Sequence, residues 1–329
     1  MAAGTHIFVV GHGHGTYKHF SRNTFGANDH TVDFAEGGGP PKAKVLRLRD
    51  MSWAVRELEI QMLEEVPNMR KAELKVAGDI VEWVVPPGVS SVVIDACGAQ
   101  GGGASHRGEP VPSQSGGFGA RVVCQAPVQA GERLRVLVGA AGETGVHGGG
   151  GGGGTFVLRA ASPAVPLAIA GGGGGAGAAS DGGPASLEET GSDGIGNNAN
   201  SGGRRGGGGQ GDGSDGAGGS GGGLAGDGEM RGSEGAHKIG RSFLHGGAGG
   251  RKGAGGHSAE HYANGGFGGG GGSGARGGGG GGYSGGGGGG GPPNKGGGGG
   301  GTLNADDARG FADVRKEGGD GRITFVYWV

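Results

Sequence analysis

The sequence predicts a mainly β protein: a β-sandwich with a long glycine-rich insertion, preceded by an extended N-terminal arm and one α-helix. Three observations support this fold class. Glycine supplies 97 of the 329 residues, strand-like apolar segments occupy residues 79–170, and one more such segment ends the chain at residues 321–329. The glycines form unbroken tracts at Gly148–Gly154, Gly171–Gly175, Gly206–Gly209, Gly268–Gly272, Gly277–Gly282, Gly285–Gly291 and Gly296–Gly301.

Composition leaves two interpretations of these tracts open. Glycine loses more conformational freedom on folding than other residues and buries no side chain, so a flexible linker is the simplest reading. A glycine chain can also run as an extended left-handed threefold helix, whose free N–H and C=O groups hydrogen-bond to neighbouring chains. A seven-residue tract would then be a rod of roughly 22 Å.

The N-terminal part carries few strand signals. Residues 1–44 are predicted to form an extended, loop-rich attachment arm with one short strand at His6–Val10, ending near the turn residues Pro40 and Pro41. Residues 45–78 are predicted to form a helix and a connector.

The helix is expected between Asp50 and Val66, because apolar residues recur there at spacings of three and four, and Pro67 ends it. An amphipathic helix packed on a sheet and a short coiled-coil seam both fit this spacing. The apolar positions are Met51, Val55, Leu58, Met62, Leu63 and Val66.

Residues 79–329 are predicted to form one glycine-rich domain. Its last segment, Arg322–Val329, is apolar on both faces and must therefore be buried. The glycine tracts offer no core for it, so the chain has to return to its first sheet, and residues 171–320 become an insertion between strands. The earlier strands are expected at Ile80–Val85, Ser91–Ala96, Ala120–Cys124, Leu134–Val138, Thr155–Arg159 and Leu167–Ala170.

Few residues suggest covalent or metal chemistry. Cys97 and Cys124 both close predicted strands, and a disulfide or two buried thiols fit equally well; their spacing is not that of a zinc site. His12 and His14 alternate as metal ligands on a strand would, but solvated histidines in a glycine-rich loop explain the same pattern. No arrangement typical of a catalytic nucleophile or a phosphate loop is present, so neither an enzyme nor a cofactor is predicted.

Charge and hydropathy exclude further classes. The net charge of −2 gives no electrostatic footprint for nucleic acid, and no apolar run is long enough to span a bilayer. The N-terminus lacks a basic segment followed by an apolar one, so no secretion signal is expected. Three alternatives are then expected: the protein is intracellular, it leaves the cell in a virus particle released by lysis, or the sequence is that of a mature protein whose signal has been removed.

Several strings resemble a known family. Together they resemble the glycine-rich domain of phage tail-fibre adhesins, bacterial surface proteins and the ectodomains of anaplastic lymphoma kinase receptors. The likeness covers residues 79–329 and implies a jelly-roll-like β-sandwich carrying polyglycine II helices. Cys97 departs from it, since many relatives have tryptophan there. The strings are Trp83–Val89, Val92–Gly103, Gly116–Ala120, Gly131–Gly139, Gly150–Val157 and Gly321–Trp328.

This resemblance implies a non-enzymatic virion protein, a tail-fibre or appendage component in host attachment. Residues 1–70 would dock on other virion proteins, the chain would form homo-oligomers, and neither nucleic acid nor membrane insertion is expected. An architectural capsid or filament protein and an extracellular adhesion or ligand-binding domain are the alternatives. The interruptions between tracts would display the receptor contacts His261, Tyr262, His257 and Phe243, although Phe243 could instead plug the bundle.

Overall fold

The computed structural model divides the chain into two units, Met1–Lys71 and Ala72–Val329, each treated by itself. In the first, it describes the backbone of the strands within residues 6–48 and of residues 69–71. In the second, the described residues are 72–105, 113–161, 165–214, 216–231, 235–254, 261–305 and 309–329.

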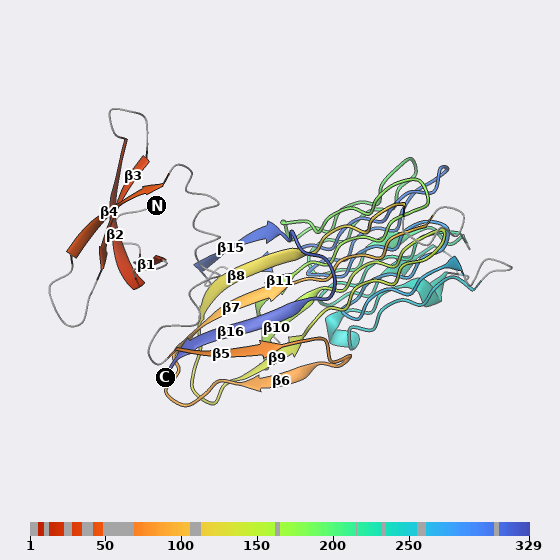
Figure 1. Cartoon of the computed structure of the whole chain (residues 1–329). Helices are drawn as coiled ribbons and strands as arrows, with labels where there is room; N and C mark the ends of the chain where they lie inside the picture. Colours follow the sequence, from red (N-terminus) through yellow and green to blue (C-terminus); the bar gives the residue numbers. More distant parts are fainter. Residues whose placement is uncertain are drawn as a thin grey trace. The chain divides into compact units, whose positions relative to one another are not determined.

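The first unit contains a four-stranded antiparallel sheet in the order β1-β2-β3-β4, drawn in red in Figure 1. The prediction of a loop-rich arm with a single strand was therefore wrong. The reason is that these strands are stabilised by pairing across hairpins, while polar and charged residues in their sequences weaken the apolar alternation that marks a strand. The predicted helix at residues 50–66 lies outside the described residues. The strands are β1 (His6–Val9), β2 (Gly13–Arg22), β3 (Asn28–Phe34) and β4 (Lys42–Leu48).

The second unit is mainly β with almost no helix, as predicted. Two five-stranded sheets in the orders β15-β8-β7-β16-β5 and β14-β11-β10-β9-β6 pack over one core. The first sheet contains β5 (Met69–Leu74), β7 (Ser91–Cys97), β8 (Ala120–Pro127), β15 (Arg309–Val314) and β16 (Arg322–Trp328). The second contains β6 (Val81–Val84), β9 (Arg133–Leu137), β10 (Thr155–Arg159), β11 (Val165–Ala170) and β14 (Leu303–Asn304).

Strand β16 returns to the first sheet, as the apolar C-terminus predicted. It pairs antiparallel with β7, with Phe325 opposite Ile94 and Ile323 opposite Ala96. Phe325 is fully buried and its ring stacks on Trp83 of the other sheet, with centroids 4.2 Å apart. The last strand therefore joins the two sheets through a shared aromatic contact.

Both edge strands of the first sheet are among the strands that the sequence analysis missed. β15 lies inside the predicted insertion 171–320 and pairs antiparallel with β8, Phe311 opposite Val123. β5 lies inside the predicted connector 45–78 and forms the other edge of the same sheet. Both are edge strands rich in charged residues, which protect a sheet edge but remove the apolar alternation that marks a strand.

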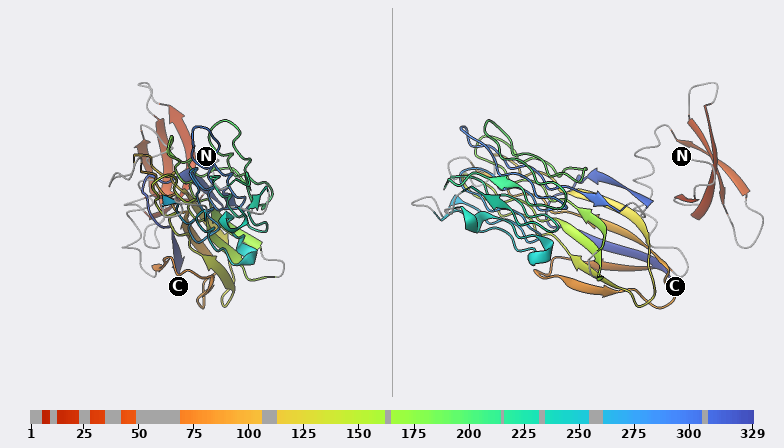
Figure 2. Two further views of the ribbon diagram at one scale, coloured as in Figure 1. Left: turned by 90° about the vertical axis from the view of Figure 1, so that its right-hand side faces the viewer. Right: turned by 180° about the vertical axis from the view of Figure 1, so that it is seen from behind.

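The glycine-rich segments lie at one end of the sandwich and run side by side without regular helix or sheet (Figures 1 and 2). A two-residue parallel pair, β12 (Gln210–Gly211) with β13 (Glu229–Met230), and two short 3₁₀ turns, η2 (Ala236–Lys238) and η3 (Phe243–His245), interrupt them.

Backbone hydrogen bonds join these segments with a period of three residues. Within Gly277–Gly282, the amides of Gly278 and Gly281 donate to Gly149 and Gly152. The bonds of the other four amides repeat in the same way. Gly279 and Gly282 donate to Gly219 and Gly222, and Gly277 and Gly280 donate to Lys295 and Gly298, all at 2.8–3.2 Å.

Carbonyl groups of the same tract accept from three more segments. Gly281 and Gly278 accept from the amides of Gly172 and Gly175, and Gly279 accepts from Gly271. Gly280 and Gly277 accept from the amides of Gly286 and Gly289. Gly277–Gly282 is therefore surrounded by six segments and bonded to each, which a flexible linker would not be.

Side chains are excluded where the segments meet. A Cβ atom on Gly279 would lie 2.1 Å from the carbonyl oxygen of Gly286, and one on Gly174 would lie 2.1 Å from that of Gly297. Such separations are far below van der Waals contact, and the opposing atoms are backbone. Glycine is therefore required here by close approach of neighbouring chains.

Candidate functional site

The two residues favoured most for a receptor contact lie together. His261 and Tyr262 are both half-buried. The His261 ring meets His147 edge-on with centroids 5.1 Å apart, and its backbone carbonyl accepts hydrogen bonds from the amides of Val146 and His147. This segment is thus fixed against residues 146–147. His257 lies outside the described residues.

Phe243 is a core residue, and its prediction as a receptor contact was wrong. Its side chain is 1% exposed and packs with Leu137, Phe156, Leu158 and Ile169 on the outer face of the second sheet. The guanidinium of Arg135 lies over its ring, 5.0 Å from the centroid. Phe243 therefore covers a sheet face, the plugging role that the sequence left open.

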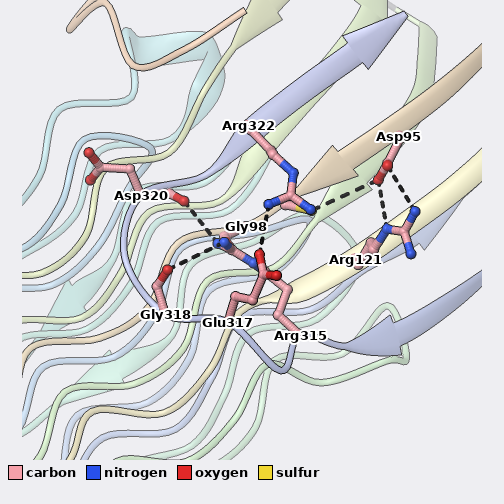
Figure 3. Close-up of polar contacts among 9 residues, drawn as sticks. Asp95, Gly98, Arg121, Arg315, Glu317, Gly318, Asp320 and Arg322 are labelled. Carbon is pink, nitrogen blue, oxygen red and sulfur yellow. Dashed lines mark hydrogen bonds and ion pairs between the residues drawn. The ribbon is translucent and has the colours of Figure 1, made fainter. Parts of the chain in front are cut away.

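A polar network links the ends of strands β7, β8, β15 and β16 in the first sheet (Figure 3). Arg121 donates two hydrogen bonds to Asp95, both of 2.8 Å, and Arg322 points toward the same carboxylate. The buried Arg315 donates to the carbonyl oxygens of Gly98 and Asp320, at 2.7 and 2.9 Å. Gly98 and Asp320 are far apart in the sequence, and Arg315 bonds both. The network therefore has a structural role: it holds together the segments that carry these residues.

The two cysteines are free and buried. Cys124 lies opposite Ile94 in the β7–β8 pair, whereas Cys97 lies opposite Arg121. Since Ile94 and Cys97 are three residues apart on one strand, the cysteines occupy opposite faces of the sheet. The disulfide that the sequence allowed is not formed.

We expect neither thiol to react with a soluble disulfide reagent at pH 8 in the folded protein. Burial, and then the charge of Asp95, raises the pKa of Cys97 to about 11, and the thiolate is the reactive form. In denaturant, two thiols per chain should react whether or not a reductant was added first. A need for prior reduction would contradict this assignment.

In the described part of the chain, an open depression of about 810 Å³ lies on the glycine-rich part. We name it the Asp227 depression. Glycine backbone forms much of its lining, and polar side chains from several loops surround it: Asp193, Arg204, Gln210, Asp227, Glu229 and His245.

Asp227 holds two of these loops together. It accepts hydrogen bonds from the amide of Ser242 at 2.8 Å, from Arg241 at 2.7 Å and from Nδ1 of His245 at 2.9 Å. Partial burial acts to raise the pKa of Asp227, but these hydrogen bonds outweigh it and lower the pKa to about 2. The carboxylate is therefore ionised at neutral pH, and Nδ1 of His245 is the donor.

An aspartate bonded to a histidine also occurs in catalytic triads. Nδ1 is the protonated nitrogen here, so a neutral His245 presents Nε2 as an acceptor. Among the described residues, no hydroxyl or thiol is hydrogen-bonded to that nitrogen. The hydrogen bonds of Asp227 therefore fix two loops to each other rather than form a triad. They also orient the imidazole of His245, whose side chain is 61% exposed to solvent.

Replacing Asp227 should weaken the fold in a pH-dependent way. The pKa of Asp227 is lowered by folding, so its contribution to stability is present above about pH 4 and lost as the pH falls toward 2. We expect Asp227→Asn to lower the free energy of unfolding by about 1 kcal/mol at pH 7, a value reduced by solvent screening.

Urea unfolding at several pH values measures this effect. The difference between wild type and Asp227→Asn should shrink between pH 4 and 2. Glu188→Gln is the matched control, because Glu188 is exposed and its carboxylate has no hydrogen bond in the described structure. A difference that stays constant down to pH 2 would contradict the role of Asp227.

The metal-binding alternative for His12 and His14 lies outside the side chains that the structure describes. The described residues contain no group of three or more histidine, cysteine, aspartate or glutamate side chains that could hold a metal ion. His12 is not among them, and of His14 the structure describes only the backbone in β2. In the same part of the chain, no helix has both the length and the apolar character to cross a bilayer.

No family model and no curated protein matches this sequence. The site must therefore be judged from its geometry. Sequence reasoning missed Asp227 and His245, because they are 18 residues apart and separated by glycines. The one usable signal was that charged residues among glycines gather in the interruptions between tracts.

Proposed function

We propose that the chain is a non-enzymatic structural protein of a virus particle, a tail-fibre or other appendage component that takes part in host attachment. The observation that carries the proposal is the glycine segment bonded to six neighbours. Such a backbone scaffold is rigid without a side-chain core and leaves the connecting loops free to vary, as in many binding proteins. The resemblance over residues 79–329 points the same way.

We infer that the glycine tracts are polyglycine II rods and that the sandwich has jelly-roll-like connections. The threefold period of the hydrogen bonds supports the rods, because polyglycine II has three residues per turn and no internal hydrogen bonds. In such a rod, successive residues hydrogen-bond to different neighbouring segments, and every third residue bonds to the same segment, as Gly278 and Gly281 do.

Hydrogen exchange tests the rods. Amides of residues 268–301 should exchange with deuterium far more slowly than those of an unstructured peptide, since they are bonded and mostly buried. The amide of Asn294, in the turn after Pro292 and Pro293, should exchange faster and is the internal control, since the two prolines carry no amide proton. Uniformly fast uptake would contradict ordered rods.

The remaining parts take roles within this proposal. Residues 1–70 dock on other virion proteins, and several copies of the chain assemble together. The loop holding His261 and Tyr262 contributes to the contact with the host surface, because these side chains are only half-buried and their segment is held in place.

Immunogold electron microscopy of lysates from producing cells tests the proposal. Antibodies against the purified chain should label appendages of virus particles. A second test is the double variant His261→Ala, Tyr262→Ala, which should reduce adsorption to host cells without reducing particle yield. Unchanged adsorption with labelled particles would favour the architectural alternative, and label on cell surfaces without particles would favour the extracellular one.

A further inference from the structure

We propose that the Asp227 depression binds a neutral, hydroxyl-rich ligand, that is, a saccharide. This inference deepens the proposed attachment function by naming a receptor chemistry, and it rests on that function only for the source of the saccharide. Its volume of about 810 Å³ lies within the range of roughly 300–1,000 Å³ that small-molecule sites occupy.

The depression is pre-organised. Asp227 joins the loops at residues 227 and 241–245 through three hydrogen bonds. On another side, Asp193 accepts a 2.8 Å hydrogen bond from the amide of Gly202. The lining glycines belong to the same hydrogen-bonded backbone, Gly228 donating to Gly240 at 2.9 Å. A site whose walls are already fixed loses less entropy on binding.

Three polar side chains remain available to a ligand. Gln210 and Glu229 lie side by side, because they are register partners in the parallel pair of β12 and β13. Both are exposed, as is Arg204. None of these three side chains forms a hydrogen bond or ion pair within the described part of the chain. With Nε2 of His245, they provide donors and acceptors around one space.

The lining selects among ligand classes. Apart from the polar imidazole of His245, it contains no aromatic side chain and no large aliphatic one, with Ala225 its one apolar residue, so it offers little to an apolar ligand. An anion would be repelled by the carboxylates of Asp193 and Glu229, and a cation would be repelled by the guanidinium of Arg204. The charge of Asp227 is already compensated by Arg241 at 2.7 Å.

A neutral saccharide is polar and carries no charge, so neither the lack of apolar lining nor the charged side chains disfavour it. Its hydroxyl groups both donate and accept, so neighbouring hydroxyls can bond a carboxylate, an amide and a guanidinium at once. The lining glycines are required by packing instead, because a Cβ atom on Gly208 or Gly228 would meet protein atoms of Asp227 or Ser220 rather than project into the depression. The polar side chains of the lining are therefore what favours a saccharide.

A printed panel of neutral, sialylated and sulfated oligosaccharides, probed with the purified full chain, tests the proposal. We expect retention on neutral oligosaccharides. Calorimetry with the best probe should then show that Glu229→Gln combined with Gln210→Ala weakens binding about tenfold or more, since hydrogen bonds to a charged group are lost. Glu188→Gln, outside the depression, should bind like wild type, and thermal unfolding should show that all variants are folded.

Contrary outcomes are equally clear. Retention only on anionic probes, no retention at all, or equal affinity in the double variant would overturn the proposal. The attachment function is judged separately by particle labelling. A chain that binds the saccharide but is absent from particles would retain this inference and lose the proposed function, and a labelled appendage that binds no saccharide would do the reverse.

Discussion

Gly279→Ala is expected to destabilise the protein by about 3 kcal/mol or more, at the upper end of the cost of overpacking a core. The new methyl group would lie 2.1 Å from the carbonyl oxygen and 2.6 Å from the carbonyl carbon of Gly286. Neither atom belongs to a side chain that could rotate away. The tract would have to move from the neighbours to which it is bonded, Gly219 and Gly271 among them.

Urea or thermal unfolding of the purified variant measures this loss. Gly216→Ala is the matched control, since a Cβ there would have Ala275 at 3.9 Å as its nearest neighbour, and we expect a change within about 0.5 kcal/mol. Equal stability of the two variants would mean that the glycine segments do not pack as described.

Phe325→Ala should cost about 3–5 kcal/mol, the usual loss for a buried phenylalanine. Its side chain is fully buried between the sheets and stacks on Trp83 at 4.2 Å. The strand that carries it closes the domain after the glycine insertion, so the change also weakens the return of the chain to its sheet.

Val329→Ala is the control for this variant. Val329 is 61% exposed at the end of the same segment, and its replacement should change stability by no more than about 0.5 kcal/mol. Chemical denaturation followed by tryptophan fluorescence suits the test, because Trp83 is in direct contact with Phe325. A Phe325→Ala variant as stable as wild type would contradict the role of β16.

The apolar strands were predictable because their signal is local. Ser91–Ala96 and Thr155–Arg159 are dense in apolar and β-branched residues, and both are strands in the structure. β15 was not predictable in the same way, because Arg309 and Asp313 interrupt its pattern and it is a strand through its pairing with β8. The sheet of the first unit likewise depends on pairing across hairpins.

The candidate site was less accessible to sequence reasoning. His261 and Tyr262 could be chosen because an aromatic pair among glycines is conspicuous, whereas Phe243 had the same appearance and is buried. Which ring faces solvent depends on what packs against it. Asp227 and His245 form one unit only through the folding of the loops that carry them.

Composition and order along the chain thus determined that the protein is β-rich, that glycine replaces a side-chain core over a long stretch, and that the last strand must rejoin the first. Tertiary structure decided how the glycine amides pair, which aromatic side chains are buried and where polar groups converge. The physical reason is sequence separation. Apolar alternation is a property of neighbouring residues and can be seen in the sequence, whereas hydrogen bonds between glycine backbones leave no side-chain pattern and form only when distant segments come together.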